Sequence, residues 1–253
     1  MAKIIAIVNQ KGGVGKTTTT VNLTAALAAL GKRVLLCDFD PQANATSGMG
    51  VDKNFASPNV YDVLINGADP RRGVVTTHYG DVLPSNKALA GAGIELIGME
   101  RREFLLKDAL EQVKPDYDFI FIDCPPSLEL LTLNALCAAD AILVPVQGEY
   151  FALEGLSDLM NTVRIVRRSL NPRLELEGVL LTMFDGRTNL ALQVAQEVKH
   201  YFPGKVYATV IPRNVRLSEA PSHGKPITSY DRTSRGAEAY TAFAAEFLDK
   251  QSA

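Results

Sequence analysis

What the sequence lacks excludes several classes of protein. Three cysteines occur among its 253 residues, and none lies in a C-x-x-C pair, so no zinc or iron–sulfur site is expected. No run of about 18 apolar residues occurs, so no segment is expected to cross a membrane as a helix. No charged leader precedes the first apolar run, and we therefore expect a cytoplasmic protein without a signal peptide. The formal net charge of −2 gives no general reason to expect nucleic-acid binding.

The composition is that of a globular domain, with 47% hydrophobic and 21% charged residues. Its length suits one α/β domain or two small ones. No linker or repeat stands out, so we expect a single domain over residues 1–253. Cys37 and Cys124 lie in or beside apolar runs, which indicates buried thiols in a reducing compartment.

Apolar runs rich in β-branched residues recur between helix-like stretches. Continuous rather than alternating apolarity indicates strands that are covered on both faces. The order predicts an α/β fold with a doubly wound, mostly parallel sheet flanked by helices. The segment 44–97 is rich in Gly, Asn, Pro and Ser, and we expect loops and short inserted elements there. The expected strands are Ile4–Val8, Val34–Cys37, Tyr117–Asp123, Ala141–Val146, Leu176–Leu181 and Val206–Ile211.

A glycine-rich turn between the first strand and a helix-like stretch from Thr18 to Leu30 is the most informative feature. Strand, glycine turn, Lys-Thr and helix in this order predict a phosphate-binding loop. Glycines let backbone N–H groups approach phosphate oxygens, and the helix N-terminus adds about half a positive charge. Lys16 is expected to reach the β- and γ-phosphates, and the Thr17 hydroxyl to ligate Mg²⁺. The nucleotide-binding residues of this loop are Lys11, Gly12, Gly13, Val14, Gly15, Lys16, Thr17 and Thr18.

Acidic residues follow two of the expected strands. Asp38 and Asp40 are two positions apart on an extended segment, so both carboxylates can face the site. Turn chemistry before Pro41 is the alternative for this pair. Asp123 ends a buried run, as does the Walker B acid that holds Mg²⁺ directly or through water. Its alternative role is to cap a helix that starts near Ser127.

The segment 199–235 is locally basic within an acidic protein. Seven cations less two anions leave an excess of five. A solvated face and a nucleic-acid surface both fit this pattern. The cations are Lys199, Lys205, Arg213, Arg216, Lys225, Arg232 and Arg235.

A second lysine, Lys11, stands five positions before Lys16. The pair resembles the deviant Walker A signature, KGGxGK[ST], of the ParA/MinD group of dimerising P-loop ATPases. Further motifs extend over nearly the whole chain and are similar to those of the chromosome-partitioning ParA ATPases, also called Soj. These motifs are DFDPQANAT, IDCPPSL, PVQGEYFALEGL, LLTMFDGRTNL and IPRNVRLSEAPSHGKPI.

The resemblance implies an ATP- and Mg²⁺-dependent enzyme that forms a homodimer on binding ATP. Lys11 would cross to the phosphates of the partner subunit, and Lys16 would bind those of its own nucleotide. Asp40 would orient the attacking water, and Asp123 would sense the γ-phosphate and the metal together with Thr17. On spacing alone, Lys11 could equally be a solvated charge at a strand end.

The resemblance also implies contacts outside the phosphate loop. Pro212 and Asn214 would lie along the adenine, whereas Glu149 could approach the ribose or cap local structure. Arg187 and Arg216 match family arginines that contact DNA. The ATP-bound dimer would bind double-stranded DNA without sequence preference, and a ParB-like centromere-binding protein would stimulate its slow hydrolysis. The protein would then associate with the nucleoid in partitioning of a chromosome or a plasmid.

A MinD-like, membrane-associated positioning ATPase is the alternative function. Such a protein needs a C-terminal amphipathic helix with cations beside its apolar face. Here the last helical pattern places Tyr240, Phe243, Phe247 and Leu248 on one side with only Lys250 near them, so we expect core packing and no membrane binding. A metabolic enzyme, such as a small-molecule ligase or kinase, would need a second substrate pocket and would leave Lys11 without a role.

Overall fold

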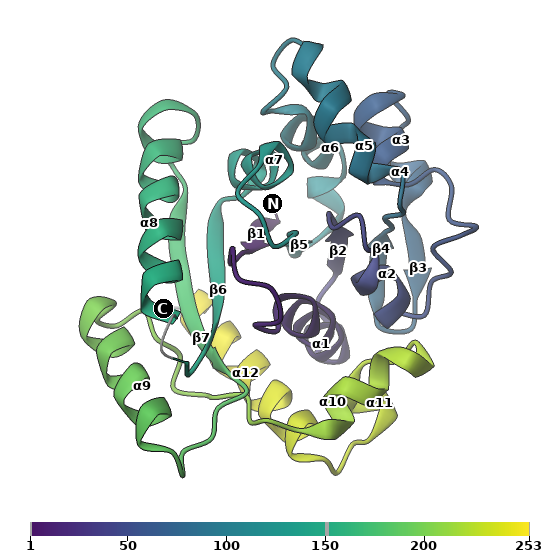
Figure 1. The fold of residues 1–253 in the computed structure, drawn as a ribbon. Coiled ribbons are helices and arrows are strands. Elements are labelled where there is room, and N and C mark those ends of the chain that lie inside the picture. Colours follow the sequence, from purple (N-terminus) through teal and green to yellow (C-terminus); the bar gives the residue numbers. More distant parts are fainter. Residues whose placement is uncertain (1, 150–151, 253) are drawn as a thin grey trace.

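A seven-stranded sheet forms the centre of the computed structural model, which describes residues 2–149 and 152–252 (Figure 1). The strand order is β3-β4-β2-β5-β1-β6-β7, and every neighbouring pair is parallel except β3 with β4. The doubly wound, mostly parallel sheet expected from the sequence is therefore confirmed. The strands are β1 (Lys3–Ile7), β2 (Val34–Asp38), β3 (Val75–Thr77), β4 (Gly80–Leu83), β5 (Phe119–Asp123), β6 (Ala141–Gln147) and β7 (Glu175–Thr182).

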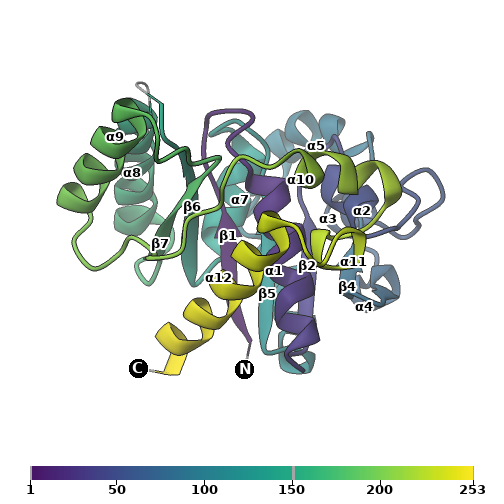
Figure 2. The same cartoon turned by 90° about the horizontal axis from the view of Figure 1, so that it is seen from below.

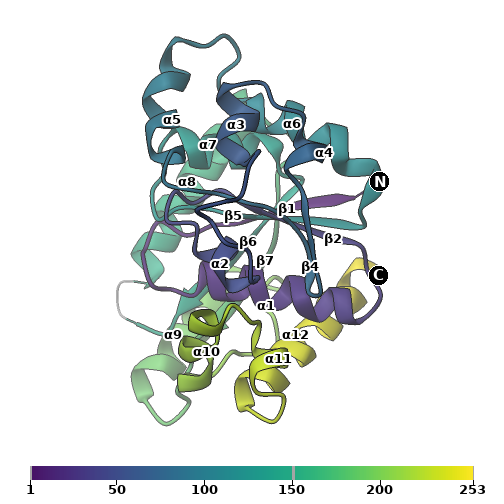
Figure 3. The same cartoon turned by 90° about the vertical axis from the view of Figure 1, so that its right-hand side faces the viewer.

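Helices cover both faces of the sheet (Figure 3). One face carries α3, α5, α6 and α7, whereas α1 and α12 pack together on the other. The helices are α1 (Lys16–Ala29), α2 (Asn44–Gly48), α3 (Val60–Ile65), α4 (Pro70–Gly73), α5 (Leu89–Glu95), α6 (Leu105–Val113), α7 (Leu130–Ala138), α8 (Ala152–Ser169), α9 (Asn189–Tyr201), α10 (Val215–Glu219), α11 (Ile227–Tyr230) and α12 (Arg235–Ser252). Short 3₁₀ turns are η1 (Leu96–Gly98), η2 (Lys114–Asp116) and η3 (Ala220–His223).

The central strands are buried because they have helices on both sides. Every residue of β2 and β5 is buried, as the continuous apolar runs predict. Cys37 and Cys124 are buried thiols, as expected, and Cys137 is buried as well. Two residues of the motif PVQGEYFALEGL, Tyr150 and Phe151, lie outside the described residues.

The C-terminal helix α12 packs its aromatic side into the core. Tyr240, Phe243 and Phe247 are each at most 1% exposed. The Phe243 ring meets Tyr207 edge-on, with 4.8 Å between the ring centroids. A membrane-surface helix would leave this side uncovered, so the expected core packing is confirmed. Among the residues that the structure describes, no helix is long and apolar enough to cross a membrane.

The Phe243→Ala substitution is expected to lower the free energy of unfolding by about 3–5 kcal/mol, because it leaves a cavity in this packed layer. Urea unfolding followed by circular dichroism measures the change. Phe55→Ala is the matched control, since Phe55 is 85% exposed and its loss should change stability by less than about 0.5 kcal/mol. Equal stability losses in the two variants would mean that α12 is not part of the core.

One expected strand, Val206–Ile211, is wrong as a strand. The segment runs beside β7, and the N–H of Tyr207 donates to the carbonyl of Val179 at 3.0 Å. The ladder then breaks, leaving isolated bridges. The reason is the Glu246 carboxylate on α12, which accepts the N–H groups of Ala208 and Thr209 at 2.7 and 2.8 Å in place of a strand partner.

The irregular segment 44–97 contains short elements, as expected, but two of them, β3 and β4, were missed as strands of the main sheet. Strand β4 pairs in parallel with β2 inside the sheet. It has four residues, and only Val82 and Leu83 are buried. So short and half-polar a strand gives no recognisable hydrophobic pattern.

Candidate nucleotide-binding site

The glycine-rich loop joins β1 to α1 at the carboxyl edge of the sheet, at the opposite end from both chain termini (Figure 2). Gly13 and Gly15 adopt φ values of 75° and 88°, a region that other residues enter only with strain. These two positions bend the chain around the space in front of α1. The sequence prediction of strand, glycine turn and helix is thus confirmed in this part of the fold.

Side chains from neighbouring strands hold the loop in this shape. The Asn9 amide donates to the carbonyl of Pro145 at 2.8 Å and accepts the N–H of Lys11 at 3.0 Å. From β7, the Thr182 hydroxyl donates to the carbonyl of Val14 at 2.7 Å. The loop is therefore fixed before any ligand binds, which reduces the entropy lost on binding.

The N-terminus of α1 is built for an anion. Gly15 occupies its N-cap position, no side chain of the described residues caps it, and its first turn contains no acidic residue. The first N–H groups of a helix lack partners within the helix, and they carry the positive end of its dipole. A phosphate group would satisfy both the donors and the charge.

Lys16 is a buried cation in this loop. Its Nζ donates to the carbonyl of Lys11 at 3.2 Å. Burial lowers the pKa of Lys16, and the nearby carboxylates of Asp123 and Asp40 act against that shift. A bound phosphate would add the anionic partner that favours the charged ammonium.

Thr17 and Asp123 lie together directly below the loop. The Thr17 hydroxyl donates to Oδ2 of Asp123 at 2.7 Å, and the Thr20 hydroxyl donates to Oδ1 at 3.0 Å. Burial raises the pKa of Asp123, and the charge of Asp38 raises it further. The alternative role as a helix cap is wrong, because α7 begins after Glu129 and Asp123 faces α1.

These residues fit a magnesium ion. Hydroxyl and carboxylate oxygens are ligands that Mg²⁺ accepts, and a dication would relieve the cost of burying Asp38 and Asp123 side by side. Among the described residues, no group of three or more His, Cys, Asp and Glu side chains could hold a metal by itself. This agrees with the usual Mg²⁺ site, in which one or two protein ligands are completed by phosphates and water.

Asp38 and Asp40 both take part in local turn contacts, and Asp40 also lies near Lys16. Oδ2 of Asp38 accepts the N–H and the hydroxyl of Thr46 at 2.7 Å each, and Oδ1 accepts the N–H of Asp40 at 3.2 Å. Oδ1 of Asp40 accepts the N–H of Gln42 at 2.9 Å, which is turn chemistry. Asp40 is nevertheless close enough to Lys16 to influence its pKa. Asp38 therefore shapes the loop that presents Asp40 to the site.

Lys11 and Glu149 form an ion pair at the rim of the site. The Lys11 Nζ lies 2.6 Å from Oε2 of Glu149, and the two side chains are 37% and 47% exposed. Exposed pairs of this kind contribute only about 0.2–1 kcal/mol. The Lys11 side chain is therefore paired within its own chain, and a stronger anion could replace Glu149 as its partner.

A cavity of about 240 Å³ adjoins the loop on the side of α12. Pro212 and Asn214 line it together with Gly15 and Thr18, so the fold brings the two expected adenine residues to the phosphate loop. The Asn214 side chain also caps α10 by accepting the N–H of Arg216 at 2.9 Å. A second cavity of about 410 Å³ lies between α1, α2 and η3, with Thr17, Thr18 and Lys225 in its lining.

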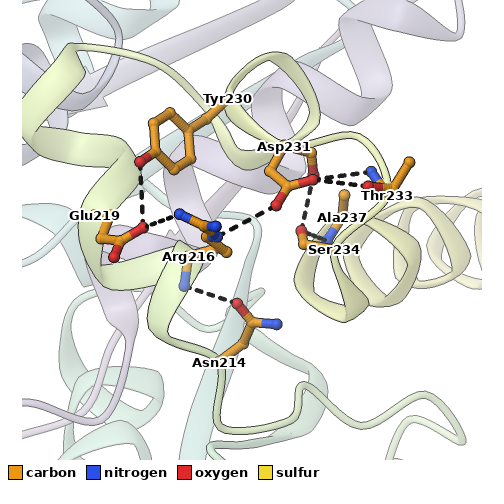
Figure 4. A network of polar contacts seen from close by, with 8 residues as sticks. All are labelled: Asn214, Arg216, Glu219, Tyr230, Asp231, Thr233, Ser234 and Ala237. Carbon is orange, nitrogen blue, oxygen red and sulfur yellow. Dashed lines mark hydrogen bonds and ion pairs between the residues drawn. The ribbon is translucent and has the colours of Figure 1, made fainter.

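The two expected DNA-binding arginines are both paired with carboxylates of their own chain. Arg187 donates twice to Asp185, at 2.8 and 2.7 Å, and this lowers the pKa of Asp185 to about 2. Arg216 lies 2.8 Å from Glu219 and 3.4 Å from Asp231 (Figure 4). The fold places them on neighbouring segments, because Phe184 near Arg187 donates its N–H to Ile211 at 2.9 Å.

Sequence reasoning missed several residues that support the site. Asn9 and Thr182 anchor the loop, and Thr46 anchors Asp38. Thr20 could have been found, since it lies three positions after Thr17 and so shares its face of the helix. The others come from distant segments and give no local signal.

Comparison with known proteins identifies the family. A family model described as an AAA domain matches residues 2–176. The sporulation initiation inhibitor protein Soj of Bacillus subtilis is 62% identical over 248 residues, which cover 97% of this chain and 98% of that protein. The chain belongs to the Soj/ParA family of chromosome-partitioning ATPases.

A second curated relative agrees with this assignment, and a solved structure under another name shares the fold. The chromosome partitioning protein ParA of Myxococcus xanthus is 51% identical over 252 residues, covering 99% of this chain and 89% of that protein. Among solved structures, one described as cobyrinic acid a,c-diamide synthase from Mycobacterium smegmatis, with bound ADP and magnesium, has a TM-score of 0.87. It is 38% identical and covers all of this chain and 96% of that chain.

Proposed function

We propose that this Soj/ParA protein is an ATP-controlled dimerising switch for partitioning of a chromosome or plasmid. The observation that carries the proposal is that Lys16 and Lys11 lie in different environments. Lys16 is buried in the phosphate loop beside Asp123, whereas Lys11 lies at the exposed rim in a weak pair. One lysine serves the nucleotide of its own chain, and the other is available to a second chain.

ATP and Mg²⁺ are the ligands of this site. The phosphates bind at the N-terminus of α1 with Lys16, and Thr17 and Asp123 hold the metal, which neutralises phosphate charge. The base lies in the cavity of about 240 Å³ along Pro212 and Asn214. Phosphoryl transfer needs placement and charge neutralisation more than covalent chemistry, and this arrangement supplies both.

Dimerisation follows from the position of Lys11. When a second subunit approaches, its γ-phosphate competes with Glu149 for Lys11, and the weakness of the exposed pair makes the exchange inexpensive. ADP lacks the γ-phosphate and therefore favours the dimer less. Asp40 orients the water that attacks the γ-phosphate. Hydrolysis removes the γ-phosphate that Lys11 binds, and the dimer therefore ends. A ParB-like partner accelerates this slow hydrolysis.

DNA binding follows from pairing two weak surfaces. One subunit should hold DNA with a dissociation constant of about 10⁻⁴ to 10⁻⁶ M, as is typical of non-specific phosphate contacts. Two surfaces in one dimer gain about 10²-fold or more through effective concentration. ATP thereby controls DNA occupancy and, with it, nucleoid association.

DNA binding measured with ATP, with ADP and without nucleotide across a salt series tests the proposal. We expect tight binding only with ATP, and a binding constant that falls steeply with salt. Equal binding in all three states would contradict the switch. Sedimentation with anionic vesicles tests the MinD-like alternative, and an ATP-saturated protein that stays monomeric in size-exclusion chromatography would favour a small-molecule enzyme.

Combined Arg187→Glu and Arg216→Glu substitutions are expected to abolish DNA binding while ATP-dependent dimerisation persists. Each change replaces a cation on the proposed DNA surface by an anion. Fluorescence anisotropy with labelled duplex DNA measures the loss, which should exceed about 10²-fold. The control is Arg167→Glu with Arg168→Glu, which reverses two exposed charges on α8. Equal loss in the control, or unchanged binding in the test variant, would locate the DNA surface elsewhere.

A further inference from the structure

Arg216 occupies the centre of a polar network that joins three elements (Figure 4). From α10, its Nη1 lies 2.8 Å from Oε2 of Glu219, and its Nε lies 3.4 Å from Oδ2 of Asp231. The Tyr230 hydroxyl, at the end of α11, donates to the same Glu219 oxygen at 3.2 Å. The guanidinium thus ties α10 to the end of α11 and to the turn that follows it.

Asp231 in turn organises the start of α12. Its Oδ1 accepts the N–H and the hydroxyl of Thr233 at 3.2 and 3.0 Å. Its carbonyl accepts the Ser234 hydroxyl at 2.8 Å, and Ser234 accepts the N–H of Ala237 at 3.2 Å as a helix cap. The position of Arg216 is therefore linked to the turn 231–234, which carries Arg232 and leads into Arg235.

The charges around Arg216 do not favour a phosphate. One guanidinium and two carboxylates leave a local charge of −1 (one minus two). The hydrogen bond from Arg216 lowers the pKa of Glu219, so this carboxylate is ionised at neutral pH. A DNA phosphate approaching Arg216 would meet Glu219 and Asp231 and would have to displace them.

Other cations of the same segment are in a different situation. They are exposed, and within residues 2–149 and 152–252 none of them takes part in an ion pair. Each can therefore meet a phosphate without breaking a contact. These cations are Arg213, Lys225, Arg232 and Arg235.

We infer that Arg216 is a positioning residue of the DNA surface, which holds α10 against the turn before α12 so that Arg232 and Arg235 face the phosphates. This inference rests on the proposed DNA-binding function and names the groups that carry it. Arg216 contributes the planar shape of its guanidinium, which bridges the Glu219 carboxylate on α10 and the Asp231 carboxylate in the turn before α12. The neighbouring cations contribute the charge that the DNA backbone recognises.

The Glu219→Gln, Asp231→Asn variant distinguishes a positioning role of Arg216 from a direct phosphate contact, because the two roles predict opposite changes in DNA affinity. It is measured as the ATP-bound dimer in the hydrolysis-deficient Asp40→Ala background, with duplex DNA across a salt series. If Arg216 positions the surface, DNA affinity falls about tenfold despite the loss of two negative charges. If Arg216 contacts phosphate directly, removing its competitors raises the affinity, and that result would overturn the inference.

A matched control accounts for the change in net charge. Glu197→Gln with Asp249→Asn removes two exposed acids that take part in no ion pair of the described residues, and affinity should then rise slightly. ATP-dependent dimerisation should persist in both variants, and thermal unfolding checks that each variant is folded. If the double variant does not fold, Asp231→Asn alone carries the same test, since it removes the ion pair that joins α10 to the turn before α12.

The salt dependence gives a second readout. Arg232→Gln or Arg235→Gln should reduce the slope of log K against log salt by about two per dimer, one for each lost phosphate contact. Arg216→Lys keeps the charge and loses the bridge, so it should weaken binding with the slope unchanged. A reduced slope in Arg216→Gln together with unchanged slopes in the other two Gln variants would assign the phosphate contact to Arg216. Absence of ATP-dependent DNA binding in the Asp40→Ala parent would overturn the proposed function itself.

Discussion

Replacing Lys16 by alanine is expected to abolish nucleotide binding. The ammonium lies buried at the N-terminus of α1, beside Asp123 and Asp40, where a phosphate would be its main counter-charge. Removing one partner of a desolvated, hydrogen-bonded charge pair costs about 2–5 kcal/mol, so affinity for ATP and ADP should fall about 10²-fold or more. Isothermal titration calorimetry with Mg²⁺ and each nucleotide measures the loss.

Two further lysine variants sharpen this result. Lys32→Ala changes an exposed lysine after α1, and it should bind nucleotide as the wild type does. Lys11→Ala should also bind nucleotide as a monomer but should fail to dimerise on ATP, because the Lys11 side chain lies at the rim, where it pairs with Glu149, and only its backbone takes part in the loop. Normal ATP affinity in Lys16→Ala would remove the loop from the mechanism.

The Asp40→Ala substitution is expected to separate binding from hydrolysis. Loss of a group that positions or deprotonates the attacking water typically reduces the rate about 10²- to 10⁴-fold. The loop keeps its shape because Asp38 still accepts both groups of Thr46, so ATP should bind and the dimer should persist. Phosphate release measures the rate, and size-exclusion chromatography with ATP measures the dimer.

Asp249→Ala serves as the control for this variant, since it removes an exposed carboxylate on α12, which is distant in sequence from Asp40. Its turnover should match the wild type. Wild-type turnover in Asp40→Ala would exclude Asp40 from the chemistry. Loss of ATP binding in Asp40→Ala would instead assign it a structural role in the loop.

The predictability of the fold differed between its parts. The long apolar runs of β5 and β6 identified central strands because burial on both faces leaves them almost wholly hydrophobic. The segment Val206–Ile211 has similar residues but is not a strand, since Glu246 on α12 takes two of its N–H groups. A competitor more than thirty residues away gives no local signal in the sequence.

The candidate site shows the same division. Spacing singled out Lys16 and Thr17, because a phosphate loop needs these residue types next to glycines in a fixed order, whereas only the family resemblance gave Lys11 a role. Spacing could not reveal that Thr17 and Thr20 both donate to Asp123, which follows them by about one hundred residues. It also could not reveal that Arg187 and Arg216, which match family arginines that contact DNA, are paired with carboxylates of their own chain.

By itself, the sequence determined the fold class and the phosphate loop, because local order and hydrophobic periodicity encode them directly, and its motifs carried the resemblance to the family. Only the tertiary structure decided which side chains form ion pairs and hydrogen bonds with one another. It paired Lys11 with Glu149 and let Asp38 accept a hydrogen bond from the Thr46 hydroxyl. It also placed Arg216 between Glu219 and Asp231. The physical reason is that electrostatic and hydrogen-bond partners are set by distance in space, and folding brings together groups that the chain keeps far apart.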